Sequence, residues 1–376
     1  MIYNTFKDLK ISALGMGTMR LPLINGDNSK IDVEAATELI AYAMSHGVNY
    51  YDTAWVYHSK TSERVMGEIL KSYPRDSFYL ATKFPGFNLD NMDKVEEIFE
   101  DQIKKCQVDY FDFYLFHNLC EANVDAYLDP KYGIFDYLMK QKQNGRIRHL
   151  GFSTHGSLTT IERFLDAYGE HMEFAQIQLN WLDWDFQNAK AKLALLRERN
   201  IPVIIMEPVR GGKLAKLEKE YESKLKALRP DESIPAWAFR FLQSIDGIFV
   251  TLSGMSNLEQ LKDNLATYEY AKPLSDKEKD TLLAIAAEMT AKTALPCTKC
   301  QYCAPHCPMS LDIPRIIELY NEHVYSGGGF IAPMTLSGWE NEKKPSACLG
   351  CRECEALCPQ GIKISEMMSD FVKRLK

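Results

Sequence analysis

Short apolar runs alternate with longer amphipathic stretches between residues 14 and 270. This alternation is typical of repeated strand and helix units that build a parallel sheet. An amphipathic stretch such as 32–47, where apolar residues recur every three or four positions before a glycine, predicts a helix between two strands. Eight runs predict strands, at residues 13–19, 48–53, 78–83, 111–117, 147–153, 174–180, 202–208 and 247–254.

Eight such units in one chain favour an α/β fold of the (β/α)8, or TIM barrel, type, whose functional residues lie at the carboxyl ends of the strands. The competing architecture is an open, doubly wound sheet, which would carry G-x-G-x-x-G between the first strand and the first helix. The corresponding segment, GMGTMR at 15–20, lacks the third glycine and is followed by a loop. We therefore predict the barrel.

The composition changes beyond the eighth strand. Residues 274–292 predict one more helix, and eight of the ten cysteines come after residue 295. We place a domain boundary near residue 293, so that residues 1–293 form the barrel and residues 294–376 form a second domain. Helix-like stretches at 312–324 and 364–376 make the second domain mainly helical, and the glycine-rich segment 326–347 between them predicts a loop.

Charge and hydropathy narrow the possible partners. The 376 residues carry a formal net charge of -7, whereas a phosphate-binding surface needs clustered Lys and Arg, so nucleic acid is not an expected partner. The first residues lack the basic and apolar regions of a signal peptide, and no stretch approaches the roughly 18 apolar residues of a membrane span. We therefore expect a soluble, cytoplasmic protein with no membrane partner.

Two cysteine blocks repeat one spacing. CTKCQYCAPHCP at 297–308 and CLGCRECEALCP at 348–359 both read C-x2-C-x2-C-x3-C-P. In a sequence of cytosolic character such blocks are typical of reduced metal ligands rather than of disulfides. Three thiolates of one tight loop can reach three irons of a cubane cluster, and in two-cluster ferredoxins the fourth cysteine ligates the other cluster. Structural zinc, the alternative, takes four ligands from paired C-x2-C knuckles.

The spacing therefore predicts a ferredoxin-type domain with two 4Fe-4S clusters. The first predicted quartet of ligands is Cys297, Cys300, Cys303 and Cys358, and the second is Cys348, Cys351, Cys354 and Cys307. A purely structural role for the clusters stays open, because metal binding contributes folding energy whatever else it does.

Four polar residues stand at predicted strand ends in the barrel. They are Asp52, Tyr57, Lys83 and His117. Lys83 and His117 each close an apolar run, which is a costly position for such a group unless it is paired or used. Because the carboxyl ends of barrel strands gather at one rim, the four side chains are candidates for one catalytic site.

These residues resemble the catalytic tetrad of the aldo-keto reductases, in which DTAxxY (52–57) is followed by a Lys and a His at the ends of the next two strands. The resemblance extends over the barrel. The similar nucleotide-binding segments are GMGTMR (15–20), GFSTHG (151–156), QIQLN (176–180) and SGMSNLEQLKDNL (253–265). The cysteine-rich tail is similar to that of the iron–sulfur-bearing subgroup, whose C-terminal domain is of the ferredoxin type with two 4Fe-4S clusters.

The resemblance implies that a small aldehyde or ketone is reduced to an alcohol by hydride transfer from NADPH or NADH. Tyr57 would give its proton to the carbonyl oxygen, and the Lys83 ammonium would lower the pKa of that phenol from its ordinary ~10. Asp52 would pair with Lys83, while His117 would hydrogen-bond and orient the substrate oxygen.

The resemblance also implies a set of cofactor contacts. They are Gly17, Thr18, Met19 and Asp52 along the cofactor, Ser153, His155 and Gln176 at the carboxamide, Met206 under the nicotinamide, Pro208, Arg210, Gly211 and Gly212 at the phosphates, and Gly254, Ser256, Gln260 and Asn264 at the adenosine end. Thr154 stands where many relatives have Asn, and Met206 where many have an aromatic ring. The family favours NADP, but the loop 253–261 lacks the Arg or Lys that a 2′-phosphate prefers, so NAD stays open.

Three functions are compatible with the sequence. In the first, hydride transfer in the barrel is coupled to the transfer of single electrons through the clusters, with a ferredoxin or another one-electron partner. In the second, the enzyme reduces carbonyls with NAD(P)H, and the clusters are structural or serve docking. In the third, the protein is a redox-sensing or electron-delivery module whose barrel binds nucleotide without carbonyl turnover. The complete tetrad favours an enzyme.

Overall fold

The computed structural model describes the whole chain, Met1 to Lys376, as two compact units. The barrel unit comprises Met1–Leu119 and Asn123–Leu282, and the cysteine-rich unit comprises Cys120–Ala122 and Leu283–Lys376. The division falls inside helix α12 (Asp276–Ala291), and the domain boundary near residue 293 stays a prediction. None of the helices combines the length and the apolar composition that crossing a membrane requires.

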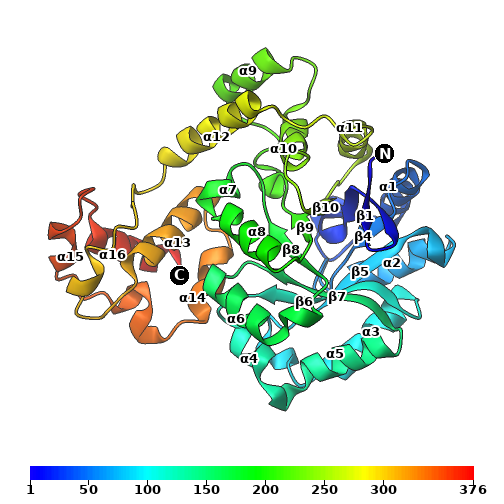
Figure 1. Cartoon of the computed structure of the whole chain (residues 1–376), viewed down its shortest axis with the longest axis horizontal. Coiled ribbons are helices and arrows are strands. Elements are labelled where there is room, and N and C mark those ends of the chain that lie inside the picture. Colours follow the sequence, from blue (N-terminus) through cyan, green and yellow to red (C-terminus); the bar gives the residue numbers. More distant parts are fainter. The chain divides into compact units, whose positions relative to one another are not determined.

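Eight parallel strands close into a barrel, as the alternating pattern predicts (Figure 1). They are β3 (Leu14–Gly17), β4 (Tyr50–Asp52), β5 (Tyr79–Phe84), β6 (Phe111–Leu119), β7 (Ile147–Thr154), β8 (Phe174–Gln178), β9 (Val203–Met206) and β10 (Ile248–Ser253). The last strand pairs with both β9 and β3 and so removes every free edge. The strands are apolar runs because each is covered on both faces, by helices outside and by the packed barrel interior.

Helices cover the outside of the barrel (Figure 1). The helices up to α11 are α1 (Val33–Ser45), α2 (Ser62–Leu70), α3 (Val95–Cys106), α4 (Val124–Leu128), α5 (Ile134–Gln143), α6 (Leu158–Tyr168), α7 (Asp183–Phe186), α8 (Ala189–Glu198), α9 (Lys219–Leu228), α10 (Ile234–Leu242) and α11 (Leu258–Thr267), of which α9 lies apart from the strands (Figure 1). Side-chain caps fix several starts, because an oxygen of Asp32, Ser157 or Asn257 accepts an otherwise unpaired amide of the first turn.

A hairpin that the sequence did not predict closes the amino-terminal end of the barrel. It consists of β1 (Tyr3–Phe6) and β2 (Leu9–Ser12), and its Phe6 ring is buried 4.7 Å from the Phe249 ring and 5.4 Å from the Phe113 ring. The turn between the strands has Lys7 in a left-handed conformation in place of glycine or asparagine. The hairpin therefore lacks the turn signal by which short strand pairs are normally found.

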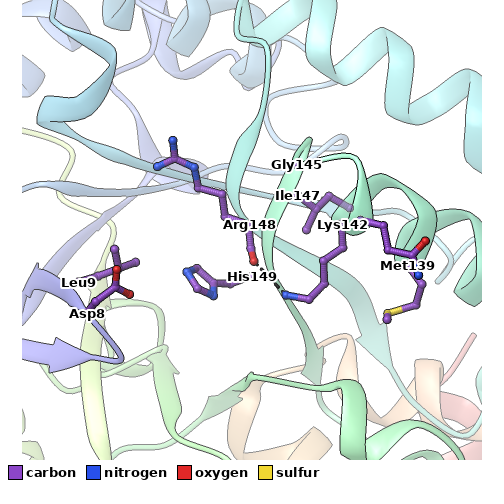
Figure 2. A pocket seen from close by; sticks show the side chains of 9 residues that line it. Asp8, Leu9, Met139, Lys142, Gly145, Ile147, Arg148 and His149 are labelled. Carbon is purple, nitrogen blue, oxygen red and sulfur yellow. Dashed lines mark hydrogen bonds between the residues drawn. The ribbon is translucent and has the colours of Figure 1, made fainter.

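The pocket drawn in Figure 2 lies at this same end of the barrel. Asp8 and Leu9 of the hairpin, part of α5 and the first residues of β7 line it. Its cations are already paired: Lys142 Nζ lies 2.5 Å from Glu173 Oε2, and Arg148 Nη1 lies 3.2 Å from Asp112 Oδ1. Functional residues of such barrels lie at the opposite, carboxyl ends of the strands, so we assign this pocket to the scaffold.

The cysteine-rich unit is mainly helical, as predicted. Its helices are α13 (Ile313–Ser326), α14 (Ile331–Ser337), α15 (Glu353–Ala356) and α16 (Ile364–Arg374), around a core that includes Ile316, Leu319 and Phe371. The loop expected over 326–347 is wrong, because it contains α14 with Ile331, Ala332 and Leu336 buried. The glycines before this helix concealed the helical spacing of its apolar residues.

The two cysteine blocks have the same backbone shape as well as the same spacing. Residues at three equivalent positions have left-handed conformations in each block, namely Lys299, Gln301 and Ser310 in the first and Gly350, Arg352 and Gly361 in the second. A helix starts at the same distance after the fourth cysteine of each block, α13 after Cys307 and α16 after Cys358. The repeated sequence therefore encodes a repeated structural unit.

Removing the Phe6 ring should destabilise the barrel. The Phe6→Ala variant leaves a cavity among buried aromatic rings, and we expect a loss of about 3–5 kcal/mol in the free energy of unfolding, measured by urea denaturation. The matched control is Leu89→Ala, because Leu89 is 51% exposed, and its effect should stay within about 0.5 kcal/mol. Equal stability of the two variants would show that the hairpin is no part of the core.

Candidate active site and cysteine sites

The barrel brings the four candidate catalytic residues to one rim. Asp52 is the last residue of β4, Lys83 and His117 lie toward the carboxyl ends of β5 and β6, and Tyr57 follows β4 in a turn. These three strands are neighbours in the sheet. Residues that the sequence separates by up to 65 positions, Asp52 to His117, thus share one end of the barrel.

A buried ion pair lies at the centre of this group. Lys83 Nζ donates to Asp52 Oδ1 at 2.6 Å and to the Thr53 carbonyl at 2.8 Å, and Lys83 and Asp52 are 1% and 2% exposed. Burial lowers the pKa of Lys83 and raises the pKa of Asp52, while each partner opposes the effect on the other. Because Nζ has two oxygen acceptors, we describe the pair as charged.

A second buried carboxylate lies behind the ion pair, and the sequence analysis did not single it out. Glu63 of α2 accepts hydrogen bonds from Thr82 Oγ1 and Gln102 Nε2, both at 2.7 Å. The same Gln102 nitrogen donates to the Lys83 carbonyl at 2.9 Å. Burial raises the pKa of Glu63. This network fixes the backbone of Lys83, and the only signal for it was a Glu among the buried, mostly apolar residues of α2.

The Tyr57 ring faces the ion pair, but one expectation about it is wrong. Its centroid lies 5.3 Å from Lys83 Nζ. Burial raises the pKa of the Tyr57 phenol, and the charges of Asp52 and Glu207 raise it further, so the expected lowering by Lys83 does not occur in this arrangement. The physical reason is that Lys83 directs its ammonium to Asp52, whose negative charge offsets its effect on the phenol.

His117 completes the group. Its ring meets the Tyr57 ring edge to face at 6.3 Å and the Phe87 ring at 5.1 Å. Burial lowers the pKa of His117 well below its ordinary value, and the charge of Lys83 lowers it further. The imidazole is therefore neutral at physiological pH, and its Nδ1 has no hydrogen bond partner within the protein. A neutral ring of this kind can donate one hydrogen bond to an oxygen of a ligand.

The predicted carboxamide residues lie together on neighbouring strands. Ser153 of β7 pairs in register with Gln176 of β8. Ser153 Oγ accepts from the Asn118 amide at 2.8 Å, and Gln176 Nε2 lies 3.7 Å from the sulfur of Met206. The Gln176 Oε1 atom is buried without a hydrogen bond partner. A buried acceptor of this kind fits an amide donor, such as the carboxamide of a nicotinamide.

Other predicted cofactor contacts are engaged within the protein. Thr18 Oγ1 donates to the Asp52 carbonyl at 3.0 Å, and Asn264 Nδ2 donates to Ser253 Oγ at 2.8 Å. Arg210, expected at the phosphates, is buried with its Nε 3.0 Å from Asp183 Oδ1. Burial and the charge of Lys192 lower the pKa of His155 to about 3, so its ring is neutral. The structure thus makes Arg210 part of a buried ion pair.

Arg20 is a candidate that the sequence analysis missed. Its side chain is exposed and lies between two glycine turns: a Cβ on Gly254 would be 3.2 Å from its methylene carbons, and a Cβ on Gly211 would be 3.1 Å from its Nη2. Gly211 and Gly212 both have left-handed conformations, and the Gly212 amide donates to the Val209 carbonyl at 3.0 Å. The position of Arg20 directly after GMGTM was the available signal.

The eight tail cysteines line two separate cavities. The first quartet, Cys297, Cys300, Cys303 and Cys358, lines one cavity, and the second quartet, Cys307, Cys348, Cys351 and Cys354, lines the other. Each cavity thus receives three cysteines from one block and the fourth from the other. No three His, Cys, Asp or Glu side chains of the chain converge as ligands of a single metal ion would. The four thiols of each quartet surround a space of their own.

Crowding of the thiols has an electrostatic consequence. Burial raises the pKa of Cys297, Cys303 and Cys354, that of Cys354 to about 11, and the neighbouring cysteines raise each of them further. Four thiolates in one cavity therefore need a cationic centre between them.

Family models match both parts of the chain. The model of the aldo/keto reductase family matches residues 13–287, and a 4Fe-4S dicluster domain matches residues 296–362. The chain therefore belongs to the aldo-keto reductase family, and it is an NAD(P)-dependent oxidoreductase with a C-terminal iron–sulfur domain.

Two curated relatives are similar to the barrel. A probable aldo-keto reductase of Glycine max is 28% identical over 211 residues, which are 54% of this chain and 57% of that protein. An NADH-specific methylglyoxal reductase of Escherichia coli is 25% identical over 305 residues, which are 69% of this chain and 90% of that protein.

Solved structures share the barrel fold. The holo form of an aldo-keto reductase from Bacillus halodurans has a TM-score of 0.62 at 24% identity, over 76% of this chain and 96% of that one. An aldo-keto reductase from Klebsiella pneumoniae, solved in complex with NADPH, has a TM-score of 0.58 at 18% identity over the same shares.

Breaking the central ion pair should cost far more than breaking a surface pair. Lys83→Met leaves the Asp52 carboxylate buried without its partner, and we expect a loss of about 3–5 kcal/mol in the free energy of unfolding. The double variant Lys83→Met with Asp52→Leu should recover most of that loss. Lys224→Met, which removes an exposed pair with Glu220, is the control and should change stability by under about 1 kcal/mol. Urea unfolding followed by tryptophan fluorescence measures all three, and equal effects of the two single variants would contradict the assignment.

Proposed function

We propose that the protein reduces a small aldehyde or ketone to an alcohol with NADPH, and that Tyr57 protonates the carbonyl oxygen. The observation that carries this proposal is the convergence of a phenol, a buried ammonium–carboxylate pair and a neutral imidazole at one barrel rim. Membership of the aldo-keto reductase family supports the same proposal independently of the structure. A nicotinamide cofactor, when bound, supplies the hydride.

The electrostatics of the site fix the protonation states of Tyr57 and His117. Burial raises the pKa of Tyr57, so the phenol is protonated at neutral pH, which is the form that a proton donor needs. His117 is neutral and donates a hydrogen bond that orients the carbonyl oxygen. As the oxygen gains negative charge, the Tyr57 proton moves to it. The Lys83 ammonium lies 5.3 Å from the ring centroid, and its pairing with Asp52 limits how far it stabilises the phenolate that remains.

The dinucleotide would lie between the residues at the ends of β3, β7, β8, β9 and β10. Ser153 and Gln176 would hold the carboxamide, Met206 would lie against the ring, and the Arg20 guanidinium with the Gly211 amide would donate to phosphate oxygens. We propose NADPH as the preferred donor, in line with the Klebsiella enzyme solved with it. The Escherichia coli relative is NADH-specific, and a preference of this protein for NADH would contradict the proposal.

We also propose that each quartet of cysteines holds one 4Fe-4S cluster. Support comes from the two cavities, from the repeated backbone shape of the blocks and from the matching family model. Cys300 and Cys351, one in each quartet, are exposed. A ligand at the surface brings its cluster within reach of a one-electron partner such as a ferredoxin, which favours electron exchange over a purely structural role.

Removing the Tyr57 hydroxyl tests the catalytic proposal. Tyr57→Phe keeps the ring and removes the proton, so kcat for reduction of methylglyoxal and 4-nitrobenzaldehyde should fall by about 10²–10⁴. Binding of NADPH, followed by its fluorescence, should stay unchanged. The control is Tyr132→Phe, on a partly exposed turn of the barrel unit, which should leave kcat unchanged. Unchanged turnover of Tyr57→Phe would instead favour a nucleotide-binding redox sensor.

Paired cysteine variants test the assignment of the quartets. Cys297→Ser with Cys358→Ser removes two ligands of the same cluster, so anaerobically prepared protein should keep about half of its iron and sulfide. Cys297→Ser with Cys307→Ser removes one ligand from each cluster and should damage both. The opposite ranking would mean that each block binds its own cluster with four cysteines. Carbonyl reduction measured on the same samples shows whether turnover depends on the clusters.

A further inference from the structure

The turn that carries Tyr57 has an unusual backbone. The three residues that follow it, His58, Ser59 and Lys60, have φ angles of 51°, 53° and 72°. Side chains with a Cβ disfavour this left-handed region, and three such residues in succession therefore need support from the surrounding structure. Ser59 and Lys60 are exposed, whereas His58 is only 2% exposed. Support can thus come from the His58 side chain.

The His58 ring lies against the turn that follows the first barrel strand. Its Nε2 lies 3.0 Å from the Thr18 carbonyl oxygen and 3.2 Å from the Leu21 amide nitrogen. These two groups flank the short 3-10 turn η1 (Thr18–Arg20), to which the implied cofactor contacts Thr18 and Met19 belong. One imidazole therefore joins the proton-donor turn, residues 57–61, to the nucleotide turn, residues 17–21.

A second set of hydrogen bonds holds the nucleotide turn, and it involves residues on either side of the proton-donor turn. Thr18 Oγ1 donates to the Asp52 carbonyl at 3.0 Å and lies 2.9 Å from Ser62 Oγ, which in turn lies 2.9 Å from Thr53 Oγ1. These contacts fix the beginning of η1 to β4 and α2. His58 is needed for the other end, because the contact to the Leu21 amide lies beyond the last residue of η1.

One ring nitrogen cannot accept from Leu21 and donate to Thr18 at the same time. A neutral ring with its proton on Nδ1 accepts from the Leu21 amide, whereas a ring that carries a proton on Nε2 donates to the Thr18 carbonyl. Burial lowers the pKa of His58, while the carbonyl groups of Thr18 and Asn28 act in the opposite direction. The neutral ring is therefore favoured at physiological pH, and it makes one of the two contacts according to which ring nitrogen carries the proton.

We propose that His58 is a positioning residue: it holds the nucleotide turn and the Tyr57 turn in one fixed relation, so that the bound dinucleotide and the phenol are aligned together. The inference rests on the proposed function for its substrate and cofactor. It assigns to His58 a role in cofactor affinity and in hydride transfer without contact to either reactant. Loss of the imidazole should release both turns at once, since each loses the same partner.

The test compares His58→Ala and His58→Gln with the wild type and with His149→Gln. The Gln side chain has both an acceptor and a donor and can keep one of the two contacts. His149 is the matched control, because it is a partly buried histidine of the same unit beside the pocket at the amino-terminal end of the barrel. Three readouts are taken on the full-length chain: hydrogen exchange of peptides covering 17–21 and 57–61, the Kd of NADPH and NADH by fluorescence, and the primary isotope effect with 4-deuterated cofactor and methylglyoxal.

We expect faster exchange in both peptides of His58→Ala and unchanged exchange elsewhere in the barrel. The Kd of the cofactor should rise about five- to tenfold, as loss of a hydrogen bond of ordinary strength predicts. Misalignment of donor and acceptor should lower kcat/KM by about 10² and raise the isotope effect, because hydride transfer becomes rate-limiting. His58→Gln should recover part of each change, and His149→Gln should show none of them.

Faster exchange in only one of the two peptides would overturn the proposal, as would wild-type values of Kd and isotope effect in His58→Ala. A general loss of stability with an unchanged isotope effect would make His58 a structural residue only and would equally overturn it. Should His58→Ala fail to fold, His58→Gln decides on the same readouts. If the wild type binds neither dinucleotide, the proposed function fails. In that case hydrogen exchange still tests the positioning role, which is overturned if faster exchange in His58→Ala is not confined to the two turns.

Discussion

The ion pair between Lys83 and Asp52 is the interaction on which the barrel site depends. Burying two charges costs several kcal/mol for each, and the cost is offset only where the partners meet at short range with their remaining hydrogen bonds made. Here the separation is 2.6 Å, the Thr53 carbonyl accepts a second hydrogen bond from the ammonium, and Gln102 secures the Lys83 backbone, whereas the second carboxylate oxygen of Asp52 has no hydrogen bond partner. The pair also affects the pKa of Tyr57. Because Asp52 offsets the positive charge of Lys83, burial is the dominant effect on the pKa of the phenol.

Closure of the barrel is what makes this pair possible. A parallel strand order brings the ends of β4, β5 and β6 together, and the hairpin β1–β2 fills the opposite end with the Phe6 ring. The residues proposed to bind the nucleotide follow β3, β7, β8, β9 and β10, and they lie at the same rim of the barrel as the ion pair. Thr18 and His58 connect the two sides through hydrogen bonds to backbone groups, so the geometry of one side restricts that of the other.

The cysteine-rich unit follows a different principle. Its core is small, and metal binding contributes folding energy to such domains directly. Each block repeats the same left-handed positions, and each is followed by a helix that packs into the common core. Because the fourth cysteine of a block lies beyond its tight loop, it reaches the cavity of the other block, and the two blocks close each other's sites.

The sequence by itself determined the barrel, because periodicity encodes it, and it determined the tetrad positions and the sorting of the cysteines through the resemblance of their motifs to those of known families. It did not find α14, the hairpin, or the partners behind Lys83 such as Glu63, which depend on contacts between distant segments. It also gave the wrong direction for the pKa of Tyr57, since burial and the orientation of a charge are properties of the packed fold. Only the tertiary structure decided that Arg210 lies in an ion pair with Asp183 and that His58 meets the turn at Thr18, because both contacts join residues whose separation in the chain carries no periodic signal.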